Sequence, residues 1–167
     1  QYIHTLDIPY TIFRPVAFME NHNWSRAYIL SGTYTGMGLR SDKGVQNIAV
    51  EDIAAFAALA FTDAKFYLGK TLELAGDELT EAQAAEVFAK VIGRPVTLAA
   101  PQMDGGRAPV EEMIAMFNFF NGEGYDADIA ALRKLHPGLL NFEQYLLKNG
   151  WENQQPIPFP EKSAWGS

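Results

Sequence analysis

Cysteine is absent from this chain of 167 residues. Its absence excludes disulfide bonds, thiolate nucleophiles and zinc sites built on cysteine. A chain without cysteine is consistent with a reducing compartment, and we expect a cytoplasmic protein. The chain also has no initiator methionine and no signal-like N-terminus, and we expect it to be part of a longer protein.

Basic residues and long apolar runs are scarce as well. Lys and Arg total 13 against 20 Asp and Glu, which gives a net charge of −7. Because phosphate contacts need clustered basic residues, direct nucleic-acid binding is not expected. The longest apolar run, residues 53–61, is too short to span a bilayer. Apolar and aromatic residues are abundant, at 48% and 13% of the chain, and they favour one folded domain over disorder.

Several catalytic signatures are missing too. There is no Gly-x-Ser-x-Gly motif of a hydrolase. No Tyr-x-x-x-Lys pair occurs, so the usual dehydrogenase base lies elsewhere, is replaced or is absent. The acidic residues Glu73, Asp77 and Glu78 lack the regular ligand spacing of a metal site and have no histidine nearby in sequence. We predict a solvated turn at these residues and no metal.

A short strand is predicted at Tyr10–Phe13, a β-branched and aromatic run between Pro9 and Pro15. In an open α/β sheet, ligands bind beyond the carboxyl ends of the strands, so the residues after this strand are expected to face a ligand. The whole pattern predicts an α/β fold, with further strands at 33–35, 45–50, 71–74 and 96–99 and helices at 1–6, 18–30, 51–62, 81–92, 109–120, 127–135 and 142–149.

The clearest local signal is a capping box formed by Thr80 and Gln83, which predicts the start of a helix. Gly93 is expected to end this helix, because glycine adopts the left-handed conformation that closes many helices. The helix should bury one apolar stripe, formed by Val87, Phe88, Val91 and Ile92.

Five segments carry a family resemblance: Ile8–Pro15 with Phe18–Asn21, Ile48–Ala54, Gly69–Gly76, Met116–Phe120 and Phe142–Leu146. In this order they resemble the NmrA-like family of atypical short-chain dehydrogenases/reductases, which bind NAD(P). The resemblance extends from Gln1 to about Gly150. The family's N-terminal Gly-rich loop and upstream active-site lysine have no counterpart in these residues.

The resemblance implies that residues 1–150 form the C-terminal part of a Rossmann-like NAD(P)-binding fold. The last Rossmann strand would be followed by a small α/β subdomain on the substrate side. Residues 151–167 are expected to be a flexible tail, held at Trp151 or Phe159. Because the pyrophosphate cradle belongs to the absent N-terminal half, binding of NADP or NAD requires that half.

The resemblance also implies that Phe18, Met19, Glu20 and Asn21 lie along the nicotinamide end of the cofactor. The chemistry fits, since an asparagine amide matches a carboxamide and an aromatic ring can flank a flat one. From the residues alone, the favoured alternative is that Phe18 and Met19 pack in the core and Asn21 caps a helix. The resemblance favours the functional interpretation.

Three other polar residues have structural and functional interpretations. Arg14 could bind a phosphate, but it is expected to form an ion pair or to bind a backbone carbonyl. Asp52 could be a catalytic acid, but it is expected to complement the dipole of its helix and to bond the backbone of the first turn. His22 could face the cleft and donate a proton to a substrate, although a surface position is the commoner outcome for histidine.

Residues 31–44 are rich in glycine and predict a loop. A phosphate-binding turn is rejected, because the segment does not connect a buried strand to a helix. Two interpretations stay open, a plain loop and a flap over the substrate cleft. In the flap interpretation Trp24, Tyr28 and Met37 line the cleft, and the expected substrate contacts are Phe18, Trp24 and Met37.

Two functions of different classes follow from the resemblance. The first is an oxidoreductase that uses NAD(P)H to reduce a small carbonyl, quinone or enone. The second is a non-catalytic NAD(P) redox sensor or transcriptional regulator that acts through a protein partner. The aromatic helix around residues 116–120 would serve as a lid or as a partner surface, with core packing as the third possibility. A homodimer is also expected, since the first strand by itself leaves exposed edges.

Overall fold

The computed structural model describes residues 2–101 and 111–157. In the labels used here, η marks a 3-10 helix. The elements in chain order are η1 (Tyr2–Thr5), β1 (Ile12–Pro15), β2 (Ala17–Phe18), η2 (Met19–Ser25), α1 (Arg26–Leu30), β3 (Thr33–Thr35), β4 (Gly44–Ile48), α2 (Val50–Thr62), α3 (Ala64–Tyr67), β5 (Thr71–Leu74), β6 (Asp77–Thr80), α4 (Glu81–Ile92), β7 (Thr97–Ala99), α5 (Glu111–Asn121), α6 (Ile129–Leu135) and α7 (Phe142–Lys148).

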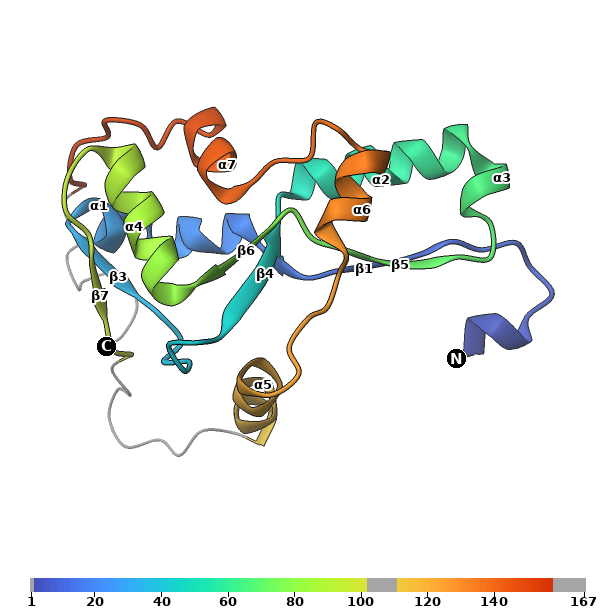
Figure 1. Cartoon of the computed structure of the whole chain (residues 1–167), viewed down its shortest axis with the longest axis horizontal. Coiled ribbons are helices and arrows are strands. Elements are labelled where there is room, and N and C mark those ends of the chain that lie inside the picture. The colour runs from blue at the N-terminus through green and yellow to red at the C-terminus, as the bar shows by residue number, and fades with distance from the viewer. Residues whose placement is uncertain (1, 102–110, 158–167) are drawn as a thin grey trace, which may run out of the picture.

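The described strands form three small sheets. Strand β1 pairs with β5 and strand β3 with β7, both in parallel. In the third sheet β4 is the central strand, parallel to β2 and antiparallel to β6. The parallel partners are far apart in sequence and are joined through helices, which is the α/β pattern. Figure 1 shows β1 and β5 extending toward the end of the molecule that carries the N-terminus, with β3 and β7 at the opposite end.

Two separate cores support this arrangement. One core packs η2, α1, α4 and α7 together around large side chains that include Phe88 and Trp151. The other core joins β5, α2 and α6 around Phe56. The consecutive residues Ile48 and Ala49, at the end of β4, belong to different cores: Ile48 to the second and Ala49 to the first. Both are fully buried, so this junction connects the two halves of the fold.

Helix α4 begins and ends where its sequence predicts. The Gln83 N–H donates to Thr80 Oγ1 at 3.2 Å, and the Thr80 N–H donates to Gln83 Oε1 at 2.8 Å, which confirms the capping box. Gly93 ends the helix in the left-handed conformation, with φ +73°, which a side chain would strain. Of the predicted stripe, three residues are buried, while Val87 packs against the core from a partly buried position.

The N-terminal elements differ from the prediction. The first strand spans Ile12–Pro15 instead of residues 10–13, because its pairing with β5 continues to its last residue. A proline is tolerated at a strand end, where its missing N–H breaks no ladder hydrogen bond. The single α-helix expected at 18–30 is wrong in its first part, which is a 3-10 helix. Its apolar residues do not repeat with a period of 3.6, and no side chain caps either η2 or α1.

The predicted acidic turn is also wrong. Glu73 lies in β5, where it forms an ion pair with Arg14 at 3.7 Å, as expected for Arg14. Asp77 and Glu78 begin β6, a strand that the sequence pattern does not predict. Acidic residues have low strand propensity, and pairing with β4 overrides it. The one-turn helix α3 also lacks a signal in the sequence, because a single turn is too short for a repeating pattern.

Asp52 is buried and bonds residues that are distant in sequence. Its carboxylate accepts a hydrogen bond from the Leu140 N–H at 3.1 Å and another from His136 Nε2 at 3.1 Å. Burial raises the pKa of Asp52, while these two hydrogen bonds oppose the rise. Asp52 therefore joins α2 to the connection between α6 and α7, in addition to its expected place in the first turn of α2.

Trp151 is fully buried and holds the residues that follow α7. Its ring lies 5.4 Å from that of Phe88, and the Arg26 guanidinium lies 4.4 Å above it. Two residues singled out from the sequence, Pro109 and Phe159, lie outside the described residues.

Candidate functional site

A pocket of about 410 Å³ opens beside η2. Its walls come from the β2–η2 segment, from β3 and the loop after it, from β4, from the start of α4 and from α5. Pockets for small organic ligands typically have volumes of about 300 to 1,000 Å³. The pocket is therefore large enough for such a ligand.

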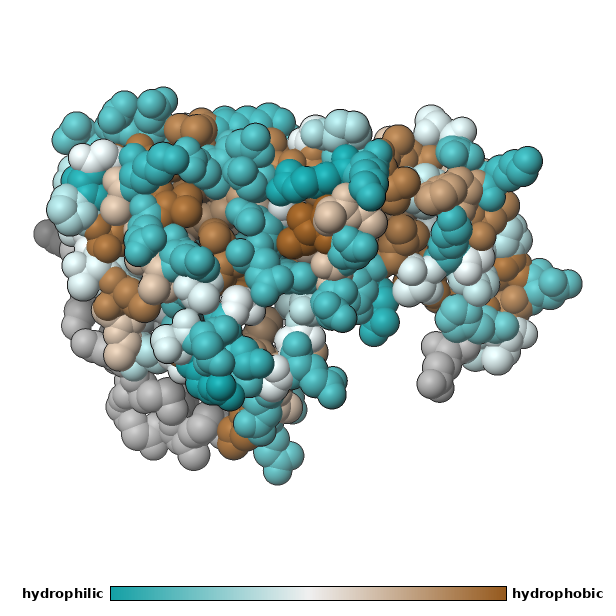
Figure 2. Space-filling model, viewed as in Figure 1, coloured by the Kyte–Doolittle hydropathy of each residue, from teal (hydrophilic) through white to brown (hydrophobic). Residues whose placement is uncertain are grey.

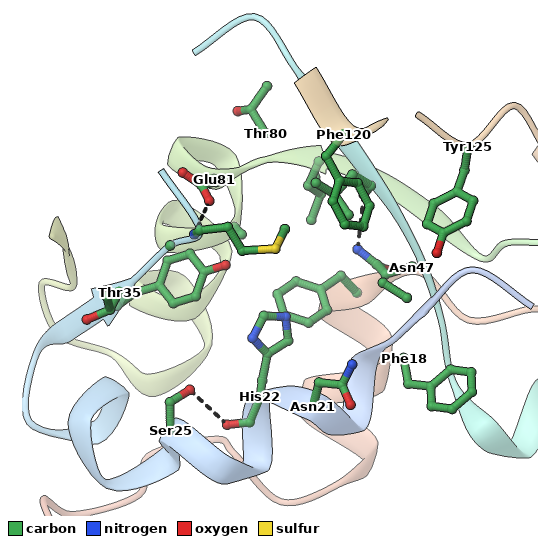
Figure 3. Close-up of a pocket in the computed structure, with 18 of the residues that line it drawn as sticks. Phe18, Asn21, His22, Ser25, Thr35, Asn47, Thr80, Glu81, Phe120 and Tyr125 are labelled. Atoms are coloured by element: carbon green, nitrogen blue, oxygen red, sulfur yellow. Dashed lines mark hydrogen bonds between the residues drawn. The ribbon is translucent and has the colours of Figure 1, made fainter. Parts of the chain in front are cut away.

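Aromatic rings form much of the pocket wall. They belong to Phe18, Tyr34, Phe120, Tyr125 and Phe142 (Figure 3). The rings of Phe120 and Tyr125 meet edge to face with centroids 5.6 Å apart. Contacts of this kind hold the rings in fixed orientations. A flat, largely apolar ligand fits such walls best.

His22 lies inside the pocket, packed among rings. Its imidazole is 5.1 Å from the ring of Phe142, 5.2 Å from that of Phe88 and 5.7 Å from that of Tyr34. Burial lowers the pKa of His22 to about 4, because the charged imidazolium would lose its hydration. At neutral pH the ring is therefore uncharged. It can donate or accept a hydrogen bond, but it is not the imidazolium that a general acid requires. Of the two interpretations of His22, the structure shows the cleft-facing one.

Asn47 contributes an amide with few partners. The side chain is 8% exposed and borders the pocket from the central strand β4. Its Nδ2 lies 3.5 Å from the Val45 carbonyl, at the limit for a hydrogen bond, and its Oδ1 has no partner. Buried polar groups are nearly always hydrogen-bonded, so this amide is exceptional.

Glu81, the first residue of α4, holds the glycine-rich loop against the pocket. Its carboxylate accepts hydrogen bonds from three consecutive backbone N–H groups, those of Met37, Gly38 and Leu39. Gly36 makes this approach possible, since a Cβ there would lie 2.5 Å from the Glu81 carboxyl carbon. The loop is thereby fixed, and Met37 becomes part of the pocket wall.

The residues assigned from the sequence to the cofactor and the substrate divide into two groups. Phe18, Asn21 and Met37 line the pocket together. Met19 is fully buried in the core, and Trp24 is 93% exposed and outside the pocket. Glu20 accepts a hydrogen bond at 3.0 Å from the backbone N–H of the first residue of α2.

The 3-10 form of η2 accounts for the buried position of Met19 and for two further pocket residues on the same face. In a 3-10 helix, side chains three residues apart share a face. Met19, His22 and Ser25 therefore follow one another on the inner face, and His22 and Ser25 reach the pocket. Trp24 lies one position away from this face and points to solvent. The exposed Tyr28 likewise lies outside the pocket wall, so the loop borders the pocket through Met37 without the two other side chains expected of a flap.

Several pocket residues were not identifiable as such from the sequence. Asn47 is a polar residue inside a strand pattern, but it shares that feature with Gln46, which lies outside the pocket wall. Glu81 stands inside the capping-box segment, where its position already has a local explanation. Phe120 and Tyr125 reach the pocket only through the packing of α5 and the residues after it.

Metal-ligating clusters and membrane-spanning helices are both absent from the described residues, 2–101 and 111–157. No group of three or more histidine, aspartate or glutamate side chains there is arranged to hold a metal ion. None of the helices in that part of the chain has the length and apolar character needed to cross a membrane.

Parallel strands joined by helices, with a ligand-sized pocket beyond β2, define an α/β protein with a Rossmann-like fold. Residues 1–146 match the NmrA-like family, and the chain belongs to it. A search of curated protein sequences found no match.

Solved structures with a similar fold include reductases and a regulator. The NADPH-dependent quinone oxidoreductase QOR2 from Escherichia coli is 25% identical, with a TM-score of 0.65 over 86% of this chain and 56% of that one. The Citrobacter sp. triphenylmethane reductase complexed with NADP(H) is 21% identical, with a TM-score of 0.67 over 87% and 55%. The negative transcriptional regulator NmrA in complex with NAD is 16% identical, with a TM-score of 0.64 over 86% and 53%. The chain thus spans little more than half the length of these structures.

Proposed function

We propose that this chain forms the substrate side of an NAD(P)H-dependent oxidoreductase that reduces a small carbonyl compound, quinone or enone. The observation that carries the proposal is the composition of the pocket. Phe18 and Asn21, the two exposed members of the nicotinamide segment, share one cavity with the aromatic side chains of Phe120 and Tyr125. A cofactor ring and a flat substrate could therefore meet there.

Asn21 and Phe18 fit the nicotinamide end of a dinucleotide. The Asn21 amide makes no hydrogen bond within the described residues, so its donors and acceptor are free for a carboxamide. The Phe18 ring is 38% exposed and can flank a flat ring. Met19 anchors η2 in the core and Glu20 ties it to α2, so these two residues would position the segment. Bound NADPH or NADH would supply the hydride.

The rest of the dinucleotide site is proposed to lie outside these 167 residues. Residues 1–150 would be the C-terminal portion of an NmrA-like domain, and residues before them would provide the pyrophosphate cradle. This agrees with the half-length overlap with NmrA and with triphenylmethane reductase, whose structures contain NAD and NADP(H). The isolated chain is expected to show no measurable dinucleotide affinity.

The chain's own residues would act mainly by positioning and by excluding water. The aromatic walls would hold the substrate against the cofactor ring, and proximity of that kind lowers the reaction barrier. His22 would donate or accept a hydrogen bond as a neutral ring, because burial keeps it uncharged. Any proton that the reduction consumes would come from water or from a residue outside this chain.

The test is turnover by the full-length protein that contains these residues. We expect NADPH absorbance to decay in the presence of a quinone panel, faster than in a protein-free blank. Asn21→Leu should lower kcat/KM about tenfold, as expected when one hydrogen bond to a reacting partner is lost. The control Glu86→Gln, at an exposed position of α4, should leave kcat/KM unchanged. Turnover equal to the blank for every quinone would contradict the proposal.

One observation favours a second candidate, a non-catalytic NAD(P) redox sensor or transcriptional regulator. Helix α5 carries four apolar side chains that are 39 to 46% exposed: Met113, Ile114, Met116 and Phe119. Exposed apolar surface of this kind suits a protein partner. The regulator NmrA has a similar fold. A full-length protein that binds NAD(P) and never turns over, but changes its affinity for a partner with the cofactor's redox state, would support this candidate.

A further inference from the structure

Asn47 is an unusual residue for its position. It lies on β4, which is bonded by β2 on one side and by β6 on the other, so its backbone cannot shift freely. Its side chain is 8% exposed, yet its Oδ1 has no partner and its Nδ2 has only one long contact. A buried amide without partners destabilises a fold, and an apolar residue would be more stable there. A ligand oxygen that accepts a shorter hydrogen bond from Nδ2 would offset part of this cost and account for the asparagine.

The surroundings of Asn47 indicate the chemistry of that ligand. None of the described residues that line the pocket is lysine or arginine, so no cation is present among them to hold an acid group. The carboxylate of Glu81 is already bonded by three N–H groups of the loop. His22 is uncharged at neutral pH because burial lowers its pKa to about 4. With aromatic walls around it, this site favours a neutral, flat molecule.

Asn47 also lies close to the segment assigned to the nicotinamide. In the β2–β4 pairing, Ala17 stands opposite Asn47 and Phe18 opposite Ile48. Figure 3 shows Asn47 between Phe120 and the Phe18–Asn21 segment. A polar group held by the Asn47 amide would therefore be next to the place proposed for the cofactor ring.

We propose that Asn47 determines the specificity of this pocket by donating a hydrogen bond from Nδ2 to the carbonyl oxygen of a neutral aromatic ketone or quinone. That this ligand is the substrate rests on the proposed function. Binding itself needs neither cofactor nor turnover. The ligand's carbonyl oxygen accepts a hydrogen bond from Asn47 Nδ2, whose contact with the Val45 carbonyl is long. The aromatic part of the ligand packs against the rings of the wall.

The test compares two ligands of equal shape on the full-length protein that contains these residues, purified without cofactor. 1-Tetralone carries a ring carbonyl, and tetralin is the same ring system without it. Binding is followed by chemical shifts in amide-resolved NMR titrations. We expect 1-tetralone to bind about fivefold more tightly than tetralin, as one net hydrogen bond predicts. The side-chain amide signal of Asn47 should shift with 1-tetralone and stay in place with tetralin.

Variants assign the difference to Asn47. Asn47→Leu should bind the two ligands equally, with tetralin affinity retained, because only the carbonyl contact is lost. The control Glu86→Gln, at an exposed position of α4 outside the pocket wall, should keep the fivefold preference. Equal binding of the two ligands by the wild-type chain, or a preference that survives in Asn47→Leu, would overturn the inference. Should Asn47→Leu fail to fold, a wild-type Asn47 amide signal that does not respond to 1-tetralone would overturn it as well.

A separate comparison keeps this inference distinct from the proposed function. 1-Naphthoate, a flat anion of similar size, should bind more weakly than 1-tetralone, since the described wall offers it no cation. Tighter binding of the anion would overturn the inference. The absence of turnover in the full-length protein would contradict the oxidoreductase while leaving the ligand preference measurable.

Discussion

His22 carries a charge state that depends on the fold. In the unfolded chain its pKa is close to 6.5, whereas burial among rings lowers it to about 4 in the folded chain. Between these two values the unfolded state binds the proton more readily, so acid favours unfolding. Asp52 acts in the opposite direction, because burial raises its pKa and lets the folded state keep a proton at a pH where the unfolded state has lost it.

We therefore predict that His22 makes the fold sensitive to mild acid. The free energy of unfolding should fall by up to about 3 kcal/mol as the pH drops from about 6.5 to about 4. In His22→Phe, which keeps a ring against Phe88 and Phe142, this part of the pH dependence should vanish. Urea unfolding of both proteins across that range measures the difference. Parallel pH profiles for the wild type and the variant would show that His22 titrates normally in the fold.

At the scale of elements, the glycine-rich loop depends on one carboxylate. Glu81→Gln keeps the shape of the side chain but replaces charge-assisted hydrogen bonds with weaker ones. The substitution should cost about 1 to 2 kcal/mol of stability and speed hydrogen exchange at Met37, Gly38 and Leu39. The exposed Glu86→Gln on the same helix is the matched control and should change neither quantity. Unchanged exchange at these three amides in Glu81→Gln would mean that other contacts fix the loop.

Elements whose signals are local were predictable from the sequence. The capping box at Thr80 and the terminal Gly93 act within one turn of helix, so their residues alone locate α4. Strand β6 is different, because it exists through pairing with β4, and its acidic residues give no local sign of it. The 3-10 form of η2 could not be predicted from the spacing of its apolar residues, and neither could the exposed position of Trp24.

The same reasoning applies to the pocket. Phe18 and Asn21 were identified through a resemblance that depends on chain order, and both line the cavity. Asn47 and Glu81 acquire their roles only when β4, the loop and α4 come together in space. A sequence shows which residue types are present, and long-range packing decides which of them share a cavity.

At the scale of the whole molecule, β1 and β5 pair with each other only among the described strands, so each has an outer edge without a partner. Apolar side chains are exposed at the same end of the molecule (Figure 2). Phe66 of α3 and Leu68, which follows it, are among the exposed apolar residues. Free strand edges beside apolar surface promote association between chains. The chain studied by itself is therefore expected to dimerise, to exchange elements or to aggregate.

Sizing chromatography at several concentrations measures this association. We expect elution earlier than a monomer of 18.5 kDa at high concentration, and thermal melts that shift with concentration. Thr71 is exposed at the start of β5. Thr71→Lys should reduce the association, because a charged lysine on an edge strand opposes pairing between chains. A monodisperse monomer that unfolds cooperatively at all concentrations would contradict the expectation.

The junction of Ile48 and Ala49 has a further consequence for how this fold tolerates change. Two adjacent side chains are buried in two different cores, so the backbone between them is held in one position. Inserting or deleting one residue here would reverse the alternation of side chains along β4 and turn its buried residues outward. Length variation should therefore be confined to the surface loops, while this short segment keeps a fixed count of residues wherever the architecture is preserved.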